Sequence, residues 1–117
     1  MKGDITLLNL TNEQSTGRVL ESDANSKLFL YFSDHGAPGH IMFPETVLYA
    51  DELNEMIQFM YDTEMYQEFV IFLEACESGS MFANTDLESL NTWALTATNS
   101  TSPSYGTYCY PHDTIED

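Results

Sequence analysis

Two short runs of apolar residues stand out along the chain because neither alternates with polar positions. Residues 28–32 read Leu-Phe-Leu-Tyr-Phe, and residues 69–73 read Phe-Val-Ile-Phe-Leu. A continuous apolar run of this length, bounded by turn residues, is typical of a strand buried on both faces in a parallel sheet. The pattern therefore predicts two buried parallel strands.

A helix is predicted between these strands, over residues 48–66. Its apolar side chains recur at steps of three and four residues, with acidic and amide side chains between them. Acidic residues near its start suit the positive end of the helix dipole. Further along, the pattern predicts a weaker extended piece at 41–44, a short helix over 80–90 and a third strand at 92–98, in which Trp93 packs; the residues after it read as loop.

The order strand, helix, strand, connector, strand is typical of an α/β fold with a parallel sheet and helical crossovers. In such a sheet the functional crevice lies beyond the carboxyl ends of the strands. His35 follows the first apolar run, and Cys76 follows the second. If the two strands are neighbours, His35 and Cys76 emerge at the same edge, one or two strand spacings apart.

This pairing favours thiol chemistry. A cysteine is mostly protonated at neutral pH and needs a nearby base to act as a nucleophile, which a histidine supplies. Gly36 has no side chain, so its backbone N–H can approach a substrate carbonyl and, with the N–H of Cys76, form an oxyanion hole. Gly79 would let the chain turn sharply after the nucleophile. These residues indicate acyl transfer by Cys76 and His35.

Composition narrows the class of protein. The 117 residues form one domain at most and are 43% hydrophobic, which suits a globular chain with a core. Three basic residues against 19 acidic ones argue against binding nucleic acid or an anionic membrane.

No apolar run approaches the roughly 18 residues of a membrane span, and the first residues lack a signal-peptide core. The sequons at Asn9 and Asn99 are short enough to arise by chance.

Other interpretations of these residues remain. A single cysteine after an apolar strand is most often a buried small hydrophobe, and a lone histidine in a turn is most often a surface residue. The placement of both in loops at strand ends favours function. A metal site of His35, His40 and Cys76 lacks the closely spaced ligand pairs of structural zinc sites, so no metal or other cofactor is expected.

Two motifs resemble those of the legumain (asparaginyl endopeptidase) family. Residues 33–39, Ser-Asp-His-Gly-Ala-Pro-Gly, resemble its histidine motif, and residues 74–81, Glu-Ala-Cys-Glu-Ser-Gly-Ser-Met, resemble its cysteine motif. The intervening helix and residues 104–109, Ser-Tyr-Gly-Thr-Tyr-Cys, fit the family as well. Caspases share the His-Gly pair and the cysteine but not the octapeptide at residues 74–81. The transamidase that attaches lipid anchors differs from this chain at residues 77–80.

The resemblance implies a caspase-like three-layer sandwich, a mostly parallel sheet with helices on both faces. It implies a cysteine endopeptidase that cleaves peptides and proteins after Asn, and after Asp at lower pH, through a thioacyl-enzyme. His35 would be the general base and acid, Cys76 the nucleophile and Gly36 an oxyanion donor. Glu74 and Ser104 would line the pocket for the asparagine side chain, whose amide needs both donors and acceptors. Absent the family, Glu74 could equally be a solvated acid that ends a strand.

Family catalytic domains are more than twice as long as this chain. Residues 1–117 are therefore expected to form a partial legumain-type domain, without the first and last strands of the family sheet and without the family prodomain. The family also implies a lysosomal, vacuolar or secretory location. Two alternatives stay open: an inactive fragment or binding module derived from such a peptidase, and a peptide ligase or transamidase that uses the same pair. Cys109 is either a free thiol or the partner of a cysteine in another chain.

Overall fold

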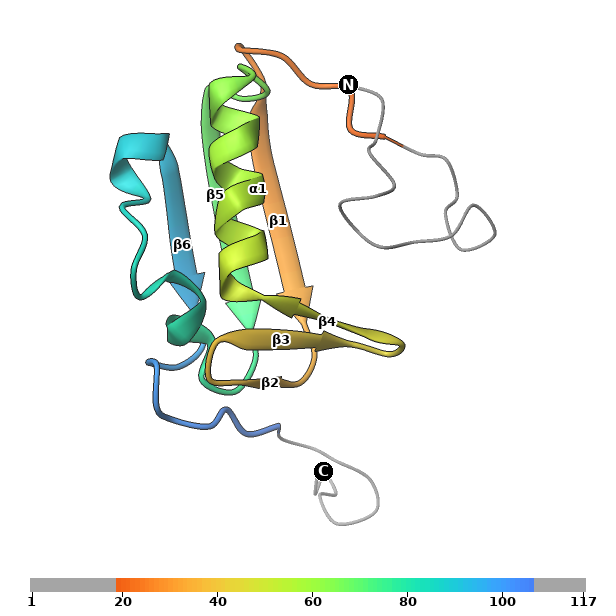
Figure 1. Ribbon diagram of the computed structural model, residues 1–117, viewed down its shortest axis with the longest axis vertical. Helices are drawn as coiled ribbons and strands as arrows, with labels where there is room; N and C mark the ends of the chain where they lie inside the picture. The colour runs from red at the N-terminus through yellow and green to blue at the C-terminus, as the bar shows by residue number, and fades with distance from the viewer. Residues whose placement is uncertain (1–18, 107–117) are drawn as a thin grey trace, which may run out of the picture.

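A parallel three-stranded sheet forms the centre of the computed structural model, which describes residues 19–106 (Figure 1). Its strands are β1 (Lys27–Ser33), β5 (Glu68–Glu74) and β6 (Thr92–Thr96), in the order β1-β5-β6. The predicted strands at 28–32 and 69–73 are thus confirmed as neighbours that run parallel. The third predicted strand is confirmed but ends at Thr96, two residues earlier than expected.

Helix α1 (Ala50–Asp62) lies against one face of this sheet (Figure 1). Its buried side chains, Leu53, Ile57 and Met60, follow the predicted three- and four-residue steps. The helix is shorter than the predicted range 48–66. The Tyr49 N–H donates to the Glu52 carboxylate at its start, and a left-handed residue, Glu64 at φ 55°, follows its last turn.

A second, antiparallel sheet lies at the carboxyl end of β1 and consists of β2 (Gly36–Ala37), β3 (His40–Phe43) and β4 (Thr46–Tyr49). Only β3 corresponds to a predicted extended piece. Strand β2 falls in a segment predicted as turn. Two residues, Pro38 and Gly39, connect β2 to β3, and Gly39 has φ +78°, as a type II turn with proline before glycine requires.

The predicted short helix over residues 80–90 consists of two separate 3-10 helices. The first, η1 (Ser78–Phe82), begins two residues after Cys76, and the second, η2 (Glu88–Leu90), precedes β6. Together the parallel sheet and helices confirm an α/β fold that agrees with part of a caspase-like sandwich.

Among the described residues, the prediction of burial on both faces is wrong for β1, whereas the second face of β5 is half-buried. Phe29 and Tyr31 of β1 are 63% and 62% exposed, and Trp93 of β6 is 56% exposed. On the opposite face, Phe69 and Ile71 of β5 are buried beneath α1. An apolar run predicts the strand but does not reveal which of its faces another element covers.

Candidate active site

The register of the parallel sheet places His35 and Cys76 at the same level. Ser33, the last residue of β1, pairs with Glu74, the last residue of β5. The Asp34 N–H donates to the Glu74 carbonyl at 3.2 Å and continues the pairing by one step. His35 and Cys76 each follow two residues after the paired strand ends, so their backbones leave adjacent strands side by side.

Direct contact between Gly36 and the cysteine loop reinforces this arrangement. A Cβ at Gly36 would lie 2.6 Å from the Cys76 carbonyl oxygen and 2.9 Å from the Ala75 Cβ, closer than real side chains pack. Position 36 therefore needs glycine because its backbone touches the backbone of Cys76. The sequence motif indicated this glycine for a different reason, its N–H.

The N–H of Gly36 points away from the hairpin that carries it. The Met42 N–H donates to the His35 carbonyl at 2.9 Å, which makes His35 and Met42 a hydrogen-bonded pair of the β2–β3 ladder. Hydrogen-bonded and non-hydrogen-bonded pairs alternate in an antiparallel ladder, so Gly36 and Ile41 form the non-hydrogen-bonded pair. The Gly36 amide is consequently available to an acceptor outside the hairpin.

The side chains of the two candidate catalytic residues differ in their surroundings. The His35 side chain is exposed, and its own backbone N–H donates to the Asp34 carboxylate at 2.7 Å. Cys76 is half-buried, and its Sγ lies 3.4 Å from both the N–H and the carbonyl of Ser104. Within residues 19–106, no hydrogen bond joins the imidazole to the thiol. Catalytic hydrogen bonds are often long in the absence of substrate and tighten when it binds.

Glu74 and Ser104 lie together beside Cys76. The Ser104 hydroxyl donates to the Glu74 carboxylate across 30 residues of sequence, and both side chains are partly buried. Glu74 is therefore not simply a solvated acid that ends a strand. The two residues predicted to share a pocket are brought together at the carboxyl end of β5, where the Ser104 backbone also touches the thiol.

The charge around this edge is acidic. Asp34 and Glu74 end or follow their strands, and Glu77 comes directly after Cys76. In the described part of the chain the only lysine or arginine is Lys27, and it pairs with Glu68 at 2.9 Å at the opposite ends of β1 and β5. A substrate group that enters here meets several carboxylates and, among residues 19–106, no lysine or arginine.

The chain turns after Cys76 at Glu77, which has φ 49°, and not at Gly79 as predicted. Gly79 is required for another reason: its Cβ would lie 2.8 Å from the backbone carbon of Asn99. Next to it, Ser78 is fully buried, and its hydroxyl accepts from the Thr98 N–H at 3.2 Å. The cysteine loop is thus packed tightly against the segment that follows β6.

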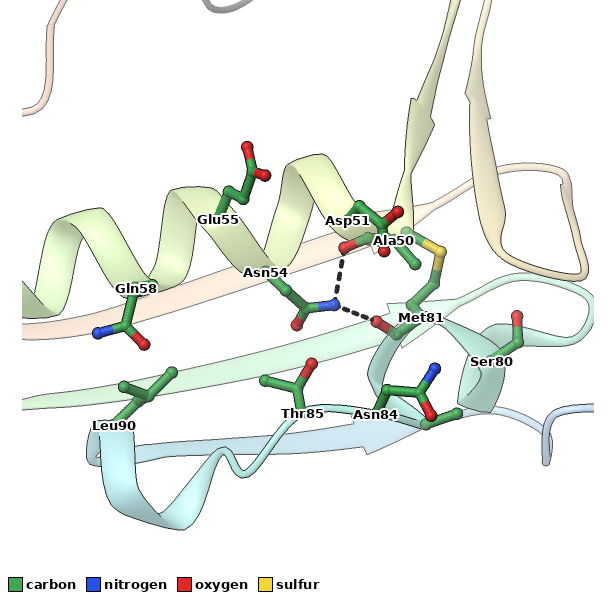
Figure 2. A pocket seen from close by; sticks show the side chains of 11 residues that line it. Ala50, Asp51, Asn54, Glu55, Gln58, Ser80, Met81, Asn84, Thr85 and Leu90 are labelled. Atoms are coloured by element: carbon green, nitrogen blue, oxygen red, sulfur yellow. Dashed lines mark hydrogen bonds between the residues drawn. The ribbon is translucent and has the colours of Figure 1, made fainter.

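A pocket of about 350 Å³ lies apart from this edge, between α1 and residues 80–90 (Figure 2). Figure 2 shows Asn54 at its centre, where its amide donates to the carbonyls of Ala50 at 2.7 Å and Met81 at 2.8 Å. This side chain ties α1 to η1. Nothing in the sequence pattern singled out Asn54, since the partner carbonyl of Met81 lies 27 residues away.

Several expectations concern features outside the active-site edge. Across residues 19–106, no group of three or more His, Cys, Asp and Glu side chains is arranged to hold a metal ion. No helix in the same range is long and apolar enough to cross a bilayer. Asn99 is exposed, whereas Asn9 and Cys109 lie outside the described residues.

Comparison with known proteins identifies relatives over most of the chain. The model of the peptidase C13 family matches residues 3–117. The hemoglobinase of Schistosoma mansoni is 44% identical over 98 residues, which cover 84% of this chain and 23% of that protein. The vacuolar-processing enzyme of Citrus sinensis is 43% identical over 95 residues, and the legumain of Bos taurus is 44% identical over 93 residues; these matches cover 80% of this chain and 19% and 21% of those proteins.

The resemblance to legumains drawn from the two motifs is thereby confirmed. The chain spans about a fifth of the length of the curated relatives it matches.

Proposed function

Because the chain belongs to the peptidase C13 family, we propose that it is a legumain-type cysteine endopeptidase with His35 and Cys76 as its catalytic pair. The observation that carries the proposal is the register of β1 and β5. It sets both residues two steps beyond paired strand ends, with Gly36 in contact with Cys76 between them. Proton transfer requires a nucleophile and a base within hydrogen-bonding reach, and adjacent strand ends start their backbones side by side.

In the proposed reaction, His35 accepts the Cys76 proton and the thiolate attacks the scissile carbonyl carbon. The tetrahedral oxyanion receives hydrogen bonds from the N–H groups of Gly36 and Cys76. As the C–N bond breaks, His35 returns the proton to the leaving amine, which leaves a thioester on Cys76. His35 then takes a proton from water as the water oxygen attacks the thioester; the C–S bond breaks to release the carboxylic acid, and His35 returns the proton to the Cys76 sulfur.

We propose that Glu74 and Ser104 select asparagine. The Glu74 carboxylate accepts from the amide NH₂ of the substrate side chain, and Ser104 contributes further hydrogen bonding beside it. An aspartate in the same place would set two carboxylates against each other, which is unfavourable until one is protonated. Cleavage after Asp is therefore expected only at lower pH.

The same proposal includes the domain, the class of substrate and the cellular location. Residues 1–117 would form part of a legumain-type domain, act on peptides or proteins and work in a vacuole or lysosome, in keeping with relatives that are called vacuolar-processing enzymes. A prodomain would be the expected family partner. No role for nucleic acid, membrane or cofactor is included.

A peptidase assay of the full chain at mildly acidic pH tests the proposal. Matched fluorogenic peptides with Asn, Asp or Gln at the cleavage position report specificity. Cys76→Ala and His35→Ala should abolish cleavage after Asn, whereas Cys109→Ala, the matched cysteine control, should leave it unchanged. Equal cleavage by the wild-type and Cys76→Ala chains, or none by either, would contradict the assignment of Cys76.

The ligase alternative uses the same thioacyl-enzyme, intercepted by an amine in place of water. Adding a peptide with a free amino terminus to the assay separates the two outcomes. Mass spectrometry should show the hydrolysed acid as the main product. A predominant ligated peptide would replace the hydrolase by a transamidase with the same catalytic pair.

A further inference from the structure

Beyond the last hydrogen bond of the paired strands, from Asp34 to Glu74, a single hydroxyl links the histidine loop to the cysteine loop. The Gly39 N–H donates to the Ser80 Oγ at 2.7 Å across 41 residues of sequence, in a partly buried position. Within the described chain, this is the only hydrogen bond between residues 35–43, which carry the histidine, and residues 76–82, which carry the cysteine. Figure 2 shows Ser80 at one end of the α1 pocket.

On the histidine side, Gly39 is held firmly relative to His35. It occupies the tight turn between β2 and β3, and its carbonyl accepts from the Ala50 N–H at 2.9 Å, at the start of α1. The ladder of the same hairpin fixes the His35 carbonyl through Met42. A displacement of Gly39 therefore also displaces His35, because the backbone between them is short and hydrogen-bonded.

On the cysteine side, Ser80 is held in the same way relative to Cys76. The Ser80 N–H donates to the Glu77 carbonyl at 2.8 Å, and the Glu77 N–H donates to the Ser102 carbonyl at 2.9 Å. Three residues separate Ser80 from Cys76, and one of them, the left-handed Glu77, fixes the turn between them. The Ser80 hydroxyl is consequently fixed with respect to the thiol.

The Asp34–Glu74 hydrogen bond holds the two loops together at their base, and the contact between Gly36 and Cys76 limits how closely they approach, but neither prevents the loops from separating beyond the strand ends. Repulsion between atoms in contact acts in one direction only, whereas a hydrogen bond resists stretching because it weakens with distance. The Ser80 hydroxyl supplies that second restraint. We propose that Ser80 is a positioning residue, whose hydrogen bond to Gly39 holds His35 at working distance from Cys76; this inference rests on the proposed function.

Ser80 touches no reacting atom in this scheme, so its removal should affect chemistry more than substrate binding. A misplacement of about 1 Å in a catalytic group lowers rates by up to roughly a hundredfold. Ser80→Ala should lower kcat for an Asn substrate by about tenfold and leave KM unchanged. Ser80→Thr keeps the hydroxyl and should restore kcat.

Ser89→Ala is the matched control variant. Ser89 also lies in a 3-10 helix and its hydroxyl also bonds to a backbone group, the Asp86 carbonyl at 2.9 Å, but it lies in η2 away from both loops. It should retain the wild-type kcat and KM. Circular dichroism of all three variants checks that the fold is retained.

A second readout does not depend on turnover. At mildly acidic pH a free thiol is almost entirely protonated, so rapid alkylation of Cys76 by iodoacetamide reports a thiolate paired with His35. Site-resolved mass spectrometry separates Cys76 from Cys109. Ser80→Ala should slow the alkylation of Cys76 toward the rate of His35→Ala, while Ser80→Thr and Ser89→Ala should match the wild type.

The outcomes separate the two claims. If His35→Ala slows alkylation but Ser80→Ala does not, the proposed pair stands and the positioning role of Ser80 is overturned. If His35→Ala has no effect, there is no pair to position and both claims fail. A loss that Ser80→Thr does not restore, or that Ser89→Ala reproduces, makes Ser80 merely structural and also overturns the inference.

Discussion

The two faces of the parallel sheet are built from equally apolar residues but have opposite surroundings. Beneath α1, Phe69 and Leu73 of β5 are 4% and 2% exposed, and Ile71 is fully buried. On the other face, Phe29 is 63% and Trp93 is 56% exposed. The comparison shows that the apolar pattern specifies strands, whereas burial depends on which other elements cover each face.

Within residues 19–106 no element covers the second face of the sheet, which is an ordered, largely aromatic surface. Paired residues of parallel strands point to the same side, so the register aligns two rows across β1, β5 and β6. We call this set the open face: Phe29, Val70, Trp93, Tyr31, Phe72 and Leu95. Rings meet edge to face within it, with centroids 5.2 Å apart for Phe29 and Phe72. Aromatic pairs of this geometry stabilise by about 0.5–1.5 kcal/mol beyond the area that they bury.

The largest effect is expected on the covered face. Ile71→Ala removes a fully buried side chain and leaves a cavity, which should lower the free energy of unfolding by about 2–5 kcal/mol. Val70→Ala, its neighbour on the open face, is the control and should cost less because solvent already reaches the side chain. Urea unfolding followed by circular dichroism measures both. Equal losses would contradict the difference between the faces.

A smaller effect is expected for Tyr66, which is buried at the edge of the covered core. Its hydroxyl donates to the Leu90 carbonyl at 2.8 Å and lies 3.0 Å from the Thr92 hydroxyl. Tyr66→Phe removes this buried hydrogen bond but leaves the Leu90 carbonyl a second donor, the Thr92 hydroxyl at 3.0 Å, so the loss should be about 1 kcal/mol at neutral pH. Differential scanning calorimetry measures the loss.

The same residue predicts a pH dependence. Burial raises the pKa of Tyr66 above its ordinary value of 10.0, and the hydrogen bond with Thr92 opposes this only in part. A raised pKa in the folded state means that the stability it contributes is complete below pH 10 and is lost as pH rises through the folded pKa. The wild type should therefore lose more stability than Tyr66→Phe in strongly alkaline buffer. Parallel alkaline unfolding curves for the two chains would contradict this.

Polar substitution on the open face should change stability still less. Phe29→Thr and Tyr31→Thr replace exposed rings by another residue that favours strands, so we expect changes within about 1 kcal/mol. Binding of an apolar dye such as ANS should fall in the double variant. A loss as large as that of Ile71→Ala would show that the open face is covered in solution.

The smallest effect is expected at the amino-terminal end of the strands. Lys27 and Glu68 form an ion pair at 2.9 Å, with both side chains more than half exposed. Lys27→Gln should lower the free energy of unfolding by no more than about 0.5 kcal/mol, and the difference should shrink in high salt. Unfolding in low and high salt checks both statements. A loss that persists unchanged in high salt would contradict a purely electrostatic role.

Much of the fold could be predicted because its main strands and helix have strong local patterns. The runs at 28–32 and 69–73 and the periodic helix leave little choice of secondary structure. Strands β2 and β4 could not be predicted in this way. They have two and four residues and owe their conformation to pairing with β3, and the turn at Pro38 and Gly39 dominates the local pattern.

In the candidate site, too, some features could be predicted from the sequence and others could not. Topology alone predicted that His35 and Cys76 emerge at the same edge of the sheet, and the resemblance added Glu74 and Ser104. The bond from Gly39 to Ser80 could not be predicted, since a hydrogen bond across 41 residues leaves no periodic signal. The turn at Glu77 was missed because a left-handed conformation is uncommon for a residue other than glycine and was assigned to Gly79.

The pairing of Ser33 with Glu74 also requires that the segments leading to His35 and to Cys76 have equal lengths. His35 and Cys76 both lie two residues after this pair. Inserting one residue before His35 would therefore move it one position beyond Cys76, and its ring would project from the opposite side. A compensating insertion before Cys76 would be needed to bring the pair level again. Loops grafted between related chains should therefore be exchanged together, as matched segments of equal length.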